Sequence, residues 1–143
     1  MTTSDWHERL RDHGLRTTVA RAAVLDVVSE TADHLSGEEI AHSVALREPA
    51  VHRATVFRTL ERLVSAGIVA HVHLPHGATT YHLRRPAERM HLHLSCRTCG
   101  RVLDADAGLL DDVVDQLLEQ YGFDLQPTHS ALSGRCSSCP PHG

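Results

Sequence analysis

Apolar residues between Trp6 and Ser65 recur at intervals of three and four positions. That spacing places them on one face of an α-helix and predicts a series of amphipathic helices. The first half of the chain is therefore expected to contain three or four helices. The clearest apolar sets are Val24, Leu25, Val27 and Val28; Ile40, Val44 and Leu46; and Val56, Leu60, Leu63 and Val64.

Capping residues predict where these helices begin and end. Thr17 or Thr18 can cap the second helix, because a hydroxyl oxygen accepts a hydrogen bond from a free backbone N–H. Ser36 followed by Glu39 matches a capping box at the start of the third helix. Gly67 follows the last apolar residues of the fourth helix, at the position where glycine commonly ends a helix.

The apolar spacing shortens after the fourth helix and predicts a β-hairpin. Val69, Val72 and Leu74 alternate with histidines, residues 75–77 form a Pro-His-Gly turn, and a second short strand follows at Tyr81–Leu83. Helices followed by a hairpin are typical of a winged helix-turn-helix domain.

Residues 84–89 lack apolar periodicity and include a proline, so they are predicted to link two domains, residues 1–83 and residues 90–143. The fold class is then α+β, with a winged-helix domain followed by a small α/β domain. About 54 residues bury too little apolar surface for a secure core, so this second domain is expected to need a bound metal and dimerisation. Its expected elements are a strand over 90–95, a strand near 102–104, a helix over about 109–121 and a strand over about 128–134.

Composition restricts the function. The net charge is −4, so any contact with nucleic acid must come from a local basic surface, and all cationic side chains are arginines, which bind phosphate and guanine with a planar fork. No apolar run is long enough to cross a membrane. Met1–Leu10 lacks the basic start and apolar run of a signal peptide, which favours the cytoplasm.

Four cysteines form two CxxC pairs, Cys96 with Cys99 and Cys136 with Cys139. Four thiolates at this spacing suit a tetrahedral structural zinc. Two disulfides are the alternative, and a reducing cytosol argues against them. We therefore predict one zinc site that connects the two CxxC pairs.

The fourth predicted helix has one polar and one apolar face, and it is the last helix before the hairpin. Helix-turn-helix proteins place their recognition helix there, so this helix is expected to enter the major groove of DNA. A solvated amphipathic helix is the alternative. Arg53 adds a third arginine, and Glu61 is the only acid within the helix. The polar face comprises Thr55, Arg58, Thr59 and Arg62.

Histidines occur in two HxH pairs on predicted strands. His91 and His93 lie two positions apart, so both imidazoles leave the same face and can share one metal ion. His71 and His73 repeat this spacing in the hairpin.

Taken together, these motifs resemble the ferric uptake regulator (Fur) superfamily over nearly the whole chain. The resemblance implies a dimeric, metal-dependent repressor that binds a palindromic operator in double-stranded DNA, with a structural zinc and a regulatory metal between the domains. The motifs that carry it are Leu15-Arg16-Thr17-Thr18, Ala54-Thr55-Val56-Phe57-Arg58-Thr59-Leu60, His91-Leu92-His93, Cys96-Arg97-Thr98-Cys99-Gly100 and Cys136-Ser137-Ser138-Cys139.

The resemblance also implies roles for individual residues. His82 stands where relatives often have an acid, which makes the regulatory site rich in nitrogen and favours nickel, zinc or cobalt over manganese, while iron stays possible. Phe57 replaces a usual tyrosine in the DNA-binding helix, and Arg16 is expected to reach phosphate or the minor groove. By this resemblance the structural zinc falls on Cys96, Cys99, Cys136 and Cys139, and the regulatory metal falls on His34, His82, His91 and His93, with Asp104 as a possible further ligand.

The hairpin further resembles that of the actinobacterial nickel-uptake regulators within this superfamily. That resemblance implies a nickel site at His71, His73 and His129, the last on the final strand. Arg89-Met90 departs from it by removing a histidine that the nickel regulators contribute to a second site.

Three other functions stay open at this point. An iron-based peroxide sensor would use the regulatory histidines with Asp104. A zinc enzyme would need an open coordination position and a general base, but the sequence has no HExxH motif and the four cysteines close their own site. A metal-buffering protein would not need the DNA-like helix. We therefore predict a repressor that responds to nickel, with zinc and iron as alternatives, and no enzyme activity.

Overall fold

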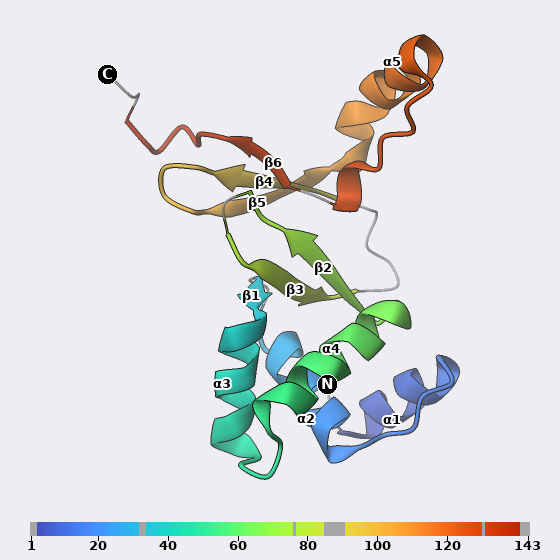
Figure 1. Cartoon of the computed structure of the whole chain (residues 1–143), viewed down its shortest axis with the longest axis vertical. Helices are drawn as coiled ribbons and strands as arrows, with labels where there is room; N and C mark the ends of the chain where they lie inside the picture. Colours follow the sequence, from blue (N-terminus) through green and yellow to red (C-terminus); the bar gives the residue numbers. More distant parts are fainter. Residues whose placement is uncertain (1–2, 32–33, 76, 85–90, 130, 141–143) are drawn as a thin grey trace. The chain divides into compact units, whose positions relative to one another are not determined.

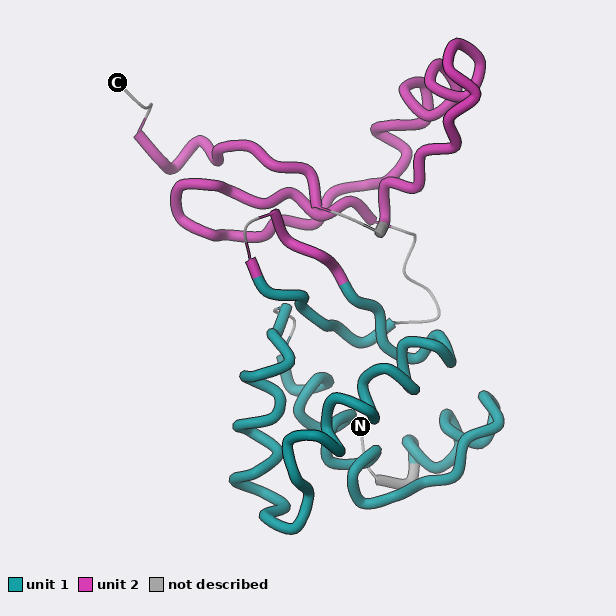
Figure 2. Tube along the Cα trace, viewed as in Figure 1, with its two compact units in different colours: residues 1–71, 78–86 teal, residues 72–77, 87–143 magenta. Residues whose placement is uncertain are grey.

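The computed structural model describes residues 3–31, 34–75, 77–84, 91–129 and 131–140. The chain divides into two compact units (Figure 2): unit 1 comprises Met1–His71 with Ala78–Pro86, and unit 2 comprises Val72–Gly77 with Ala87–Gly143. Among the described residues, no helix combines the length and the apolar character that a membrane crossing requires. The predicted linker, residues 84–89, lies outside the described residues apart from Arg84.

The predicted helices and hairpin are present in the first half of the chain (Figure 1). A two-residue strand, β1, precedes the third helix and was not predicted. The elements are α1 (Thr3–Asp12), α2 (Val19–Ser29), β1 (Leu35–Ser36), α3 (Gly37–Arg47), α4 (Arg53–Ser65), β2 (Val69–His73) and β3 (Thr79–Leu83).

The predicted caps are confirmed. The Thr18 hydroxyl accepts from the Arg21 N–H at 3.2 Å and begins α2. At α3 the Ser36 N–H donates to the Glu39 carboxylate at 2.7 Å, and the Glu39 N–H donates to the Ser36 hydroxyl at 3.2 Å, which completes the capping box. Gly67, with φ of 74°, follows the end of α4 in the left-handed conformation that glycine adopts without strain.

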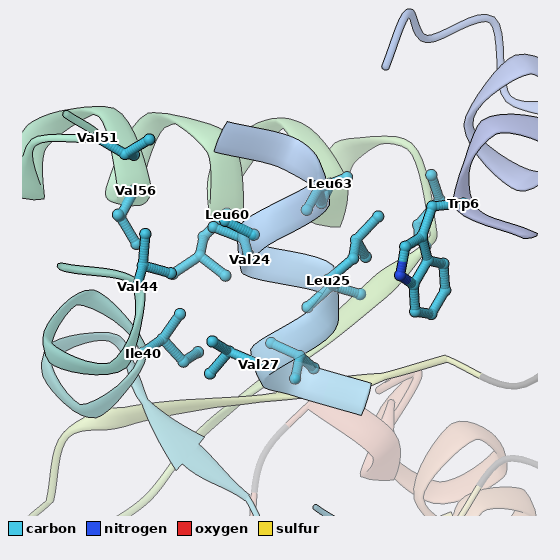
Figure 3. Packing of buried hydrophobic residues seen from close by; sticks show 14 of the residues in the cluster. Trp6, Val24, Leu25, Val27, Ile40, Val44, Val51, Val56, Leu60 and Leu63 are labelled. Atoms are coloured by element: carbon cyan, nitrogen blue, oxygen red, sulfur yellow. The ribbon is translucent and has the colours of Figure 1, made fainter. Parts of the chain in front are cut away.

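One aliphatic core holds unit 1 together. The apolar faces of α2, α3 and α4 converge on it, as Figure 3 shows, and Trp6 of α1 packs at its side with no exposed surface. The Trp6 indole N–H donates to the Asp26 carboxylate at 2.6 Å, which fixes α1 to α2. The largest side chains with no exposed surface include Leu25, Ile40, Leu60 and Leu63.

The wing is a three-stranded sheet in the order β1-β3-β2. β1 is antiparallel to β3, with Leu35 opposite Tyr81 and Ser36 opposite Thr80. A strand this short has no periodicity of its own, which is why the sequence pattern gave no sign of it. It joins the start of α3 to the hairpin.

Unit 2 is built on a second sheet, in the order β5-β4-β6, with β4 antiparallel to β5 and parallel to β6. The predicted final strand is partly wrong, because Thr128 and His129 belong to a 3₁₀ turn and the strand begins only at Ala131. The unit confirms the predicted α/β character, and the whole chain is α+β as expected. Its elements are β4 (His91–Cys96), β5 (Val102–Asp106), the 3₁₀ turn η1 (Ala107–Leu110), α5 (Asp111–Tyr121), the 3₁₀ turn η2 (Pro127–His129) and β6 (Ala131–Gly134).

Candidate functional site

The four cysteine sulfurs of unit 2 gather in one cluster, with one ligand atom per residue within 4.8 Å of the others. The Sγ atoms of Cys96 and Cys139 are 3.8 Å apart, and those of Cys99 and Cys136 are 3.7 Å apart. Zinc–sulfur bonds of about 2.3 Å in a tetrahedron separate the sulfurs by about 3.8 Å. None of the four is in a disulfide. The cluster therefore has the dimensions of a zinc site, and the disulfide alternative is excluded in this structure.

Backbone geometry favours the thiolate of Cys96. Backbone N–H groups lower the pKa of Cys96 to about 5, and the N–H of Cys136, 3.4 Å from that sulfur, contributes most. The neighbouring sulfurs, Cys136 first, raise the pKa of Cys139 to about 12. Thiolates this close repel one another, and a bound zinc ion would offset that repulsion.

The sheet of unit 2 explains how the two CxxC pairs meet. Cys96 ends β4, and the parallel register with β6 places it opposite Gly134, two residues before Cys136. The Arg97 N–H donates to the Gly134 carbonyl at 2.9 Å, which continues the contact beyond the strands. Gly100 has a φ of 74° and lets the chain turn back immediately after the first pair.

His91 and His93 lie on one strand of unit 2, with ring centroids 4.6 Å apart. His93 is only 2% exposed, and its Nδ1 is 2.9 Å from the Asp104 carboxylate on β5. The same carboxylate oxygen lies 3.8 Å from His91 Nε2. If His93 Nδ1 carries the proton and donates to Asp104, the lone pair of its Nε2 is available for a metal ion. This tautomer follows from the acceptor beside Nδ1.

His34 and His82 form a second pair, within unit 1, with ring centroids 4.7 Å apart. Extending the β1–β3 register by one residue sets His34 opposite His82. The unpredicted strand β1 is therefore what brings together two histidines that are far apart in the sequence.

The structure confirms the spacing of the two hairpin histidines of the predicted nickel site, but it does not place the third histidine beside them. His71 and His73 are two positions apart on β2, as expected. His71 is half-buried beside Tyr81, with ring centroids 6.5 Å apart, and His73 is exposed. The side chain of His129 lies outside what the structure describes, so the triad stays a prediction.

The polar face of α4 differs in one respect from the predicted surface. Arg58 and Arg62 are exposed as expected, Thr55 is half-buried, and Thr59 is buried at 8% exposure. Thr59 was expected to face outward. Leu63 follows it by four positions and Val56 precedes it by three, so Thr59 borders the buried face of the helix.

A second difference concerns the acids around α4. Glu61 is the only acid in that helix, but Glu38 of α3 forms a two-fold hydrogen bond with Arg53. The pattern within one helix could not reveal a partner from another helix. Phe57, also predicted to contact DNA, is half-buried. Arg16, the predicted contact outside α4, is exposed, and its carbonyl accepts from the Arg21 guanidinium at 2.6 Å.

Comparison with known proteins is consistent with these features. The ferric uptake regulator family model matches residues 12–132. The ferric uptake regulation protein of Bacillus subtilis is 31% identical over 134 residues, covering 92% of this chain and 90% of that protein. The zinc uptake regulation protein of Mycobacterium tuberculosis is 29% identical over 126 residues, covering 88% of this chain and 95% of that protein.

Solved structures agree in fold. The Vibrio cholerae ferric uptake regulator superposes with a TM-score of 0.68 at 28% identity, covering 91% of this chain and 98% of that one. The Helicobacter pylori ferric uptake regulator, described as having three functional metal-binding sites, gives a TM-score of 0.74 at 23% identity and covers 97% and 94%. None of these relatives is named as a nickel regulator.

A family match over most of the length, a winged helix-turn-helix and a four-cysteine cluster all agree. Members of this family are transcription regulators and not enzymes, which confirms the prediction of no enzyme activity. The chain therefore belongs to the ferric uptake regulator family and is a metal-dependent, DNA-binding transcription regulator.

Proposed function

We propose that the chain is a cytoplasmic repressor whose DNA binding depends on one regulatory metal ion held by two histidine pairs, His34 with His82 and His91 with His93. The observation that carries this proposal is that the fold holds the two imidazoles of each pair close together. The strand register sets the first pair side by side, and Asp104 orients His93 in the second. The pairs belong to different units, so a shared ion would connect the two.

Such a connection supplies a mechanism. The histidines of unit 1 and unit 2 bind the ion together only when the units adopt one arrangement, and that arrangement is the one that binds DNA. If the ion binds it about a hundredfold more tightly than the others, the coupling is about 2.7 kcal/mol, within the usual range of allosteric switches. Metal-free protein would sample other arrangements and release its operator.

Dimerisation is part of the same proposal. Unit 2 exposes apolar side chains on and around α5, including Leu118 at 53% and Tyr121 at 74%. A second copy of unit 2 would cover this surface and present two recognition helices with two-fold symmetry. Two such helices fit half-sites about one DNA turn apart, so the operator is expected to be a palindrome.

Nickel is the metal that we propose for the regulatory response, with zinc and iron as alternatives. Four imidazoles suit late first-row ions better than manganese. The hairpin pair His71 and His73, with His129, is proposed as a further nickel site on the same grounds. Genes for metal uptake are the expected targets. A peroxide-sensing version, with Asp104 as a ligand to iron, would instead add one oxygen to a ligand histidine after peroxide treatment, which mass spectrometry detects.

Calorimetric titration of zinc-loaded protein with Ni(II), Zn(II) and Fe(II) tests the proposal. We expect one tight regulatory site that is lost both in His34→Ala and in His91→Ala, and kept in His7→Ala, which removes an exposed histidine of α1. Loss in His91→Ala but not in His34→Ala would confine the site to unit 2 and contradict the shared ion. His71→Ala and His129→Ala test the hairpin site, because nickel binding lost in both would place it there.

A further inference from the structure

Arg53, at the start of α4, is held by a carboxylate from another helix. Its Nε donates to one oxygen of Glu38 at 3.1 Å, and its Nη2 donates to the other oxygen. The guanidinium carbon lies 4.7 Å from the centre of the Phe57 ring, so the planar group is bound at its edge and covered on one face. The hydrogen bonds from Arg53 keep the pKa of Glu38 below its usual range, so the pair is charged at neutral pH.

Packing between α3 and α4 supports this arrangement. A Cβ added to Gly37 would lie 2.5 Å from Cε1 of Phe57, so the ring sits directly on the glycine backbone. Gly37 therefore lets Phe57 approach the start of α3, and Phe57 in turn supports Arg53 beside Glu38. The four residues form one contact between the first turns of the two helices.

Arg58 and Arg62 of the same helix are different. Both are exposed, and neither forms an ion pair within the described part of the chain. These two arginines are open to phosphate or base edges, whereas Glu38 already binds the Nε–Nη2 edge of Arg53, one of the two edges through which a guanidinium forms two-fold contacts.

We propose that Glu38 withholds Arg53 from DNA phosphates and so limits binding that is independent of sequence. The inference rests on the proposed use of α4 as the recognition helix. The carboxylate occupies the Nε–Nη2 edge and leaves phosphate only the Nη1 side of the guanidinium. It also offsets the charge of Arg53 and repels phosphate by its own charge. Both side chains are about two-thirds exposed, at 64% for Glu38 and 66% for Arg53, so exchange of one anion for the other is not blocked by burial.

The test measures binding of metal-loaded protein to a random-sequence duplex of about three helical turns by fluorescence anisotropy. Salt is varied between about 50 and 200 mM. Glu38→Gln keeps the size of the side chain and removes its charge. We expect it to bind up to about fivefold more tightly, since a surface ion pair of this kind contributes no more than about that factor. We also expect the slope of log K against log salt to steepen by about 0.9 for each phosphate gained.

Glu30→Gln is the matched control. Glu30 also forms a two-fold hydrogen bond with an arginine, Arg47, at the other end of α3, and its side chain is similarly exposed at 56%. Its removal should leave the affinity and the slope unchanged. Arg53→Ala in the Glu38→Gln background should return the slope to that of the parent.

Other outcomes separate the inference from the proposed function. If the parent binds the duplex and Glu38→Gln has the same affinity and slope, the inference is wrong while the regulator proposal stands. Weaker binding by Glu38→Gln would mean that Glu38 positions Arg53 for DNA, which also overturns it. If Arg58→Ala binds the duplex as tightly as the parent protein does, α4 is not the recognition helix. The proposed function itself then fails at that point.

Discussion

The two units obtain their stability in different ways. Among the described residues of unit 1, seventeen buried apolar residues form one core, contributed by α1 to α4, the loops next to them and the start of β2. Among the residues that the structure describes, unit 2 buries only Val72, Leu92, Cys96 and Ala131 as apolar side chains, and α5 buries none. A unit this small gains too little from hydrophobic burial alone. Unit 1 is therefore specified by its apolar pattern, whereas unit 2 is proposed to depend on a bound metal and on a second copy of the chain.

Loss of one zinc ligand should have the largest effect, because it should unfold unit 2 and leave unit 1 folded. Cys96→Ser removes a thiolate that joins β4 to the second CxxC pair. Structural zinc contributes on the order of 10 kcal/mol to folding, so unit 2 should unfold while unit 1 keeps its helices. Zinc content by atomic absorption and helicity by circular dichroism measure the two effects.

Ser138→Ala, within the spacer of the second pair, is the control for this variant and should retain zinc. Full zinc occupancy in Cys96→Ser, with an unchanged unfolding transition for unit 2, would contradict the four-cysteine site.

A cavity in the core should produce the converse effect. Leu60 of α4 has no exposed surface, so Leu60→Ala should reduce the free energy of unfolding of unit 1 by about 2–5 kcal/mol and leave zinc in unit 2. Leu46→Ala, at a side chain 73% exposed, should change it by less than about 0.5 kcal/mol. Urea denaturation followed by circular dichroism measures both. Equal effects from the two variants would argue against the core described for unit 1.

The apolar surface of α5 tests whether unit 2 depends on a partner, because unit 2 is expected to bury this surface against a second copy. Leu118→Asp places a charge at a side chain that is 53% exposed in one chain. Dimer dissociation should increase by at least about tenfold, roughly 1.4 kcal/mol, in sedimentation equilibrium. Gln116→Asp adds the same charge at a polar position of the helix and should leave the dimer intact. If both variants stay dimeric, the surface that dimerises lies elsewhere.

The smallest expected effect concerns the capping box of α3. Ser36→Ala removes the hydroxyl that accepts from the Glu39 N–H and should cost about 1 kcal/mol of unit 1 stability. The Ser36 N–H, followed by its hydroxyl, lowers the pKa of Glu39. A lowered carboxyl pKa stabilises the fold above the unfolded value of about 4.3, and this contribution is lost as the pH falls through the lower folded value.

Urea midpoints at pH 7 and at about pH 3 measure this contribution. Glu39→Gln should narrow the difference between the two midpoints. An unchanged difference would show that the hydrogen bonds to Glu39 do not contribute to the acid sensitivity of the fold.

Short-range sequence signals correctly predicted much of the secondary structure of unit 1. Thr18, Ser36 with Glu39, and Gly67 act through neighbours within a few residues, so the sequence alone locates the helix ends. The cysteine spacing likewise predicted the cluster that the structure shows.

Features that depend on distant neighbours were missed. β1 is two residues long and forms only because β3 pairs with it, and Glu38 meets Arg53 from a different helix. Thr59 was assigned outward by a helical wheel, which cannot show what covers that face. The turn at Thr128 and His129 was taken as strand because it directly precedes one.

The separation of the two CxxC pairs along the chain has a consequence for protein synthesis. Cys136 follows Cys99 by 37 residues, and β6, which brings it beside Cys96, lies just before it. At about 5–20 residues per second, a ribosome needs roughly 2–7 seconds to add this stretch. Among the described residues, the buried core of unit 1 ends at Val69, so all of it has been translated by then. The half of the chain that meets DNA can therefore fold during translation, while the zinc site is completed only after the second cysteine pair has left the ribosome.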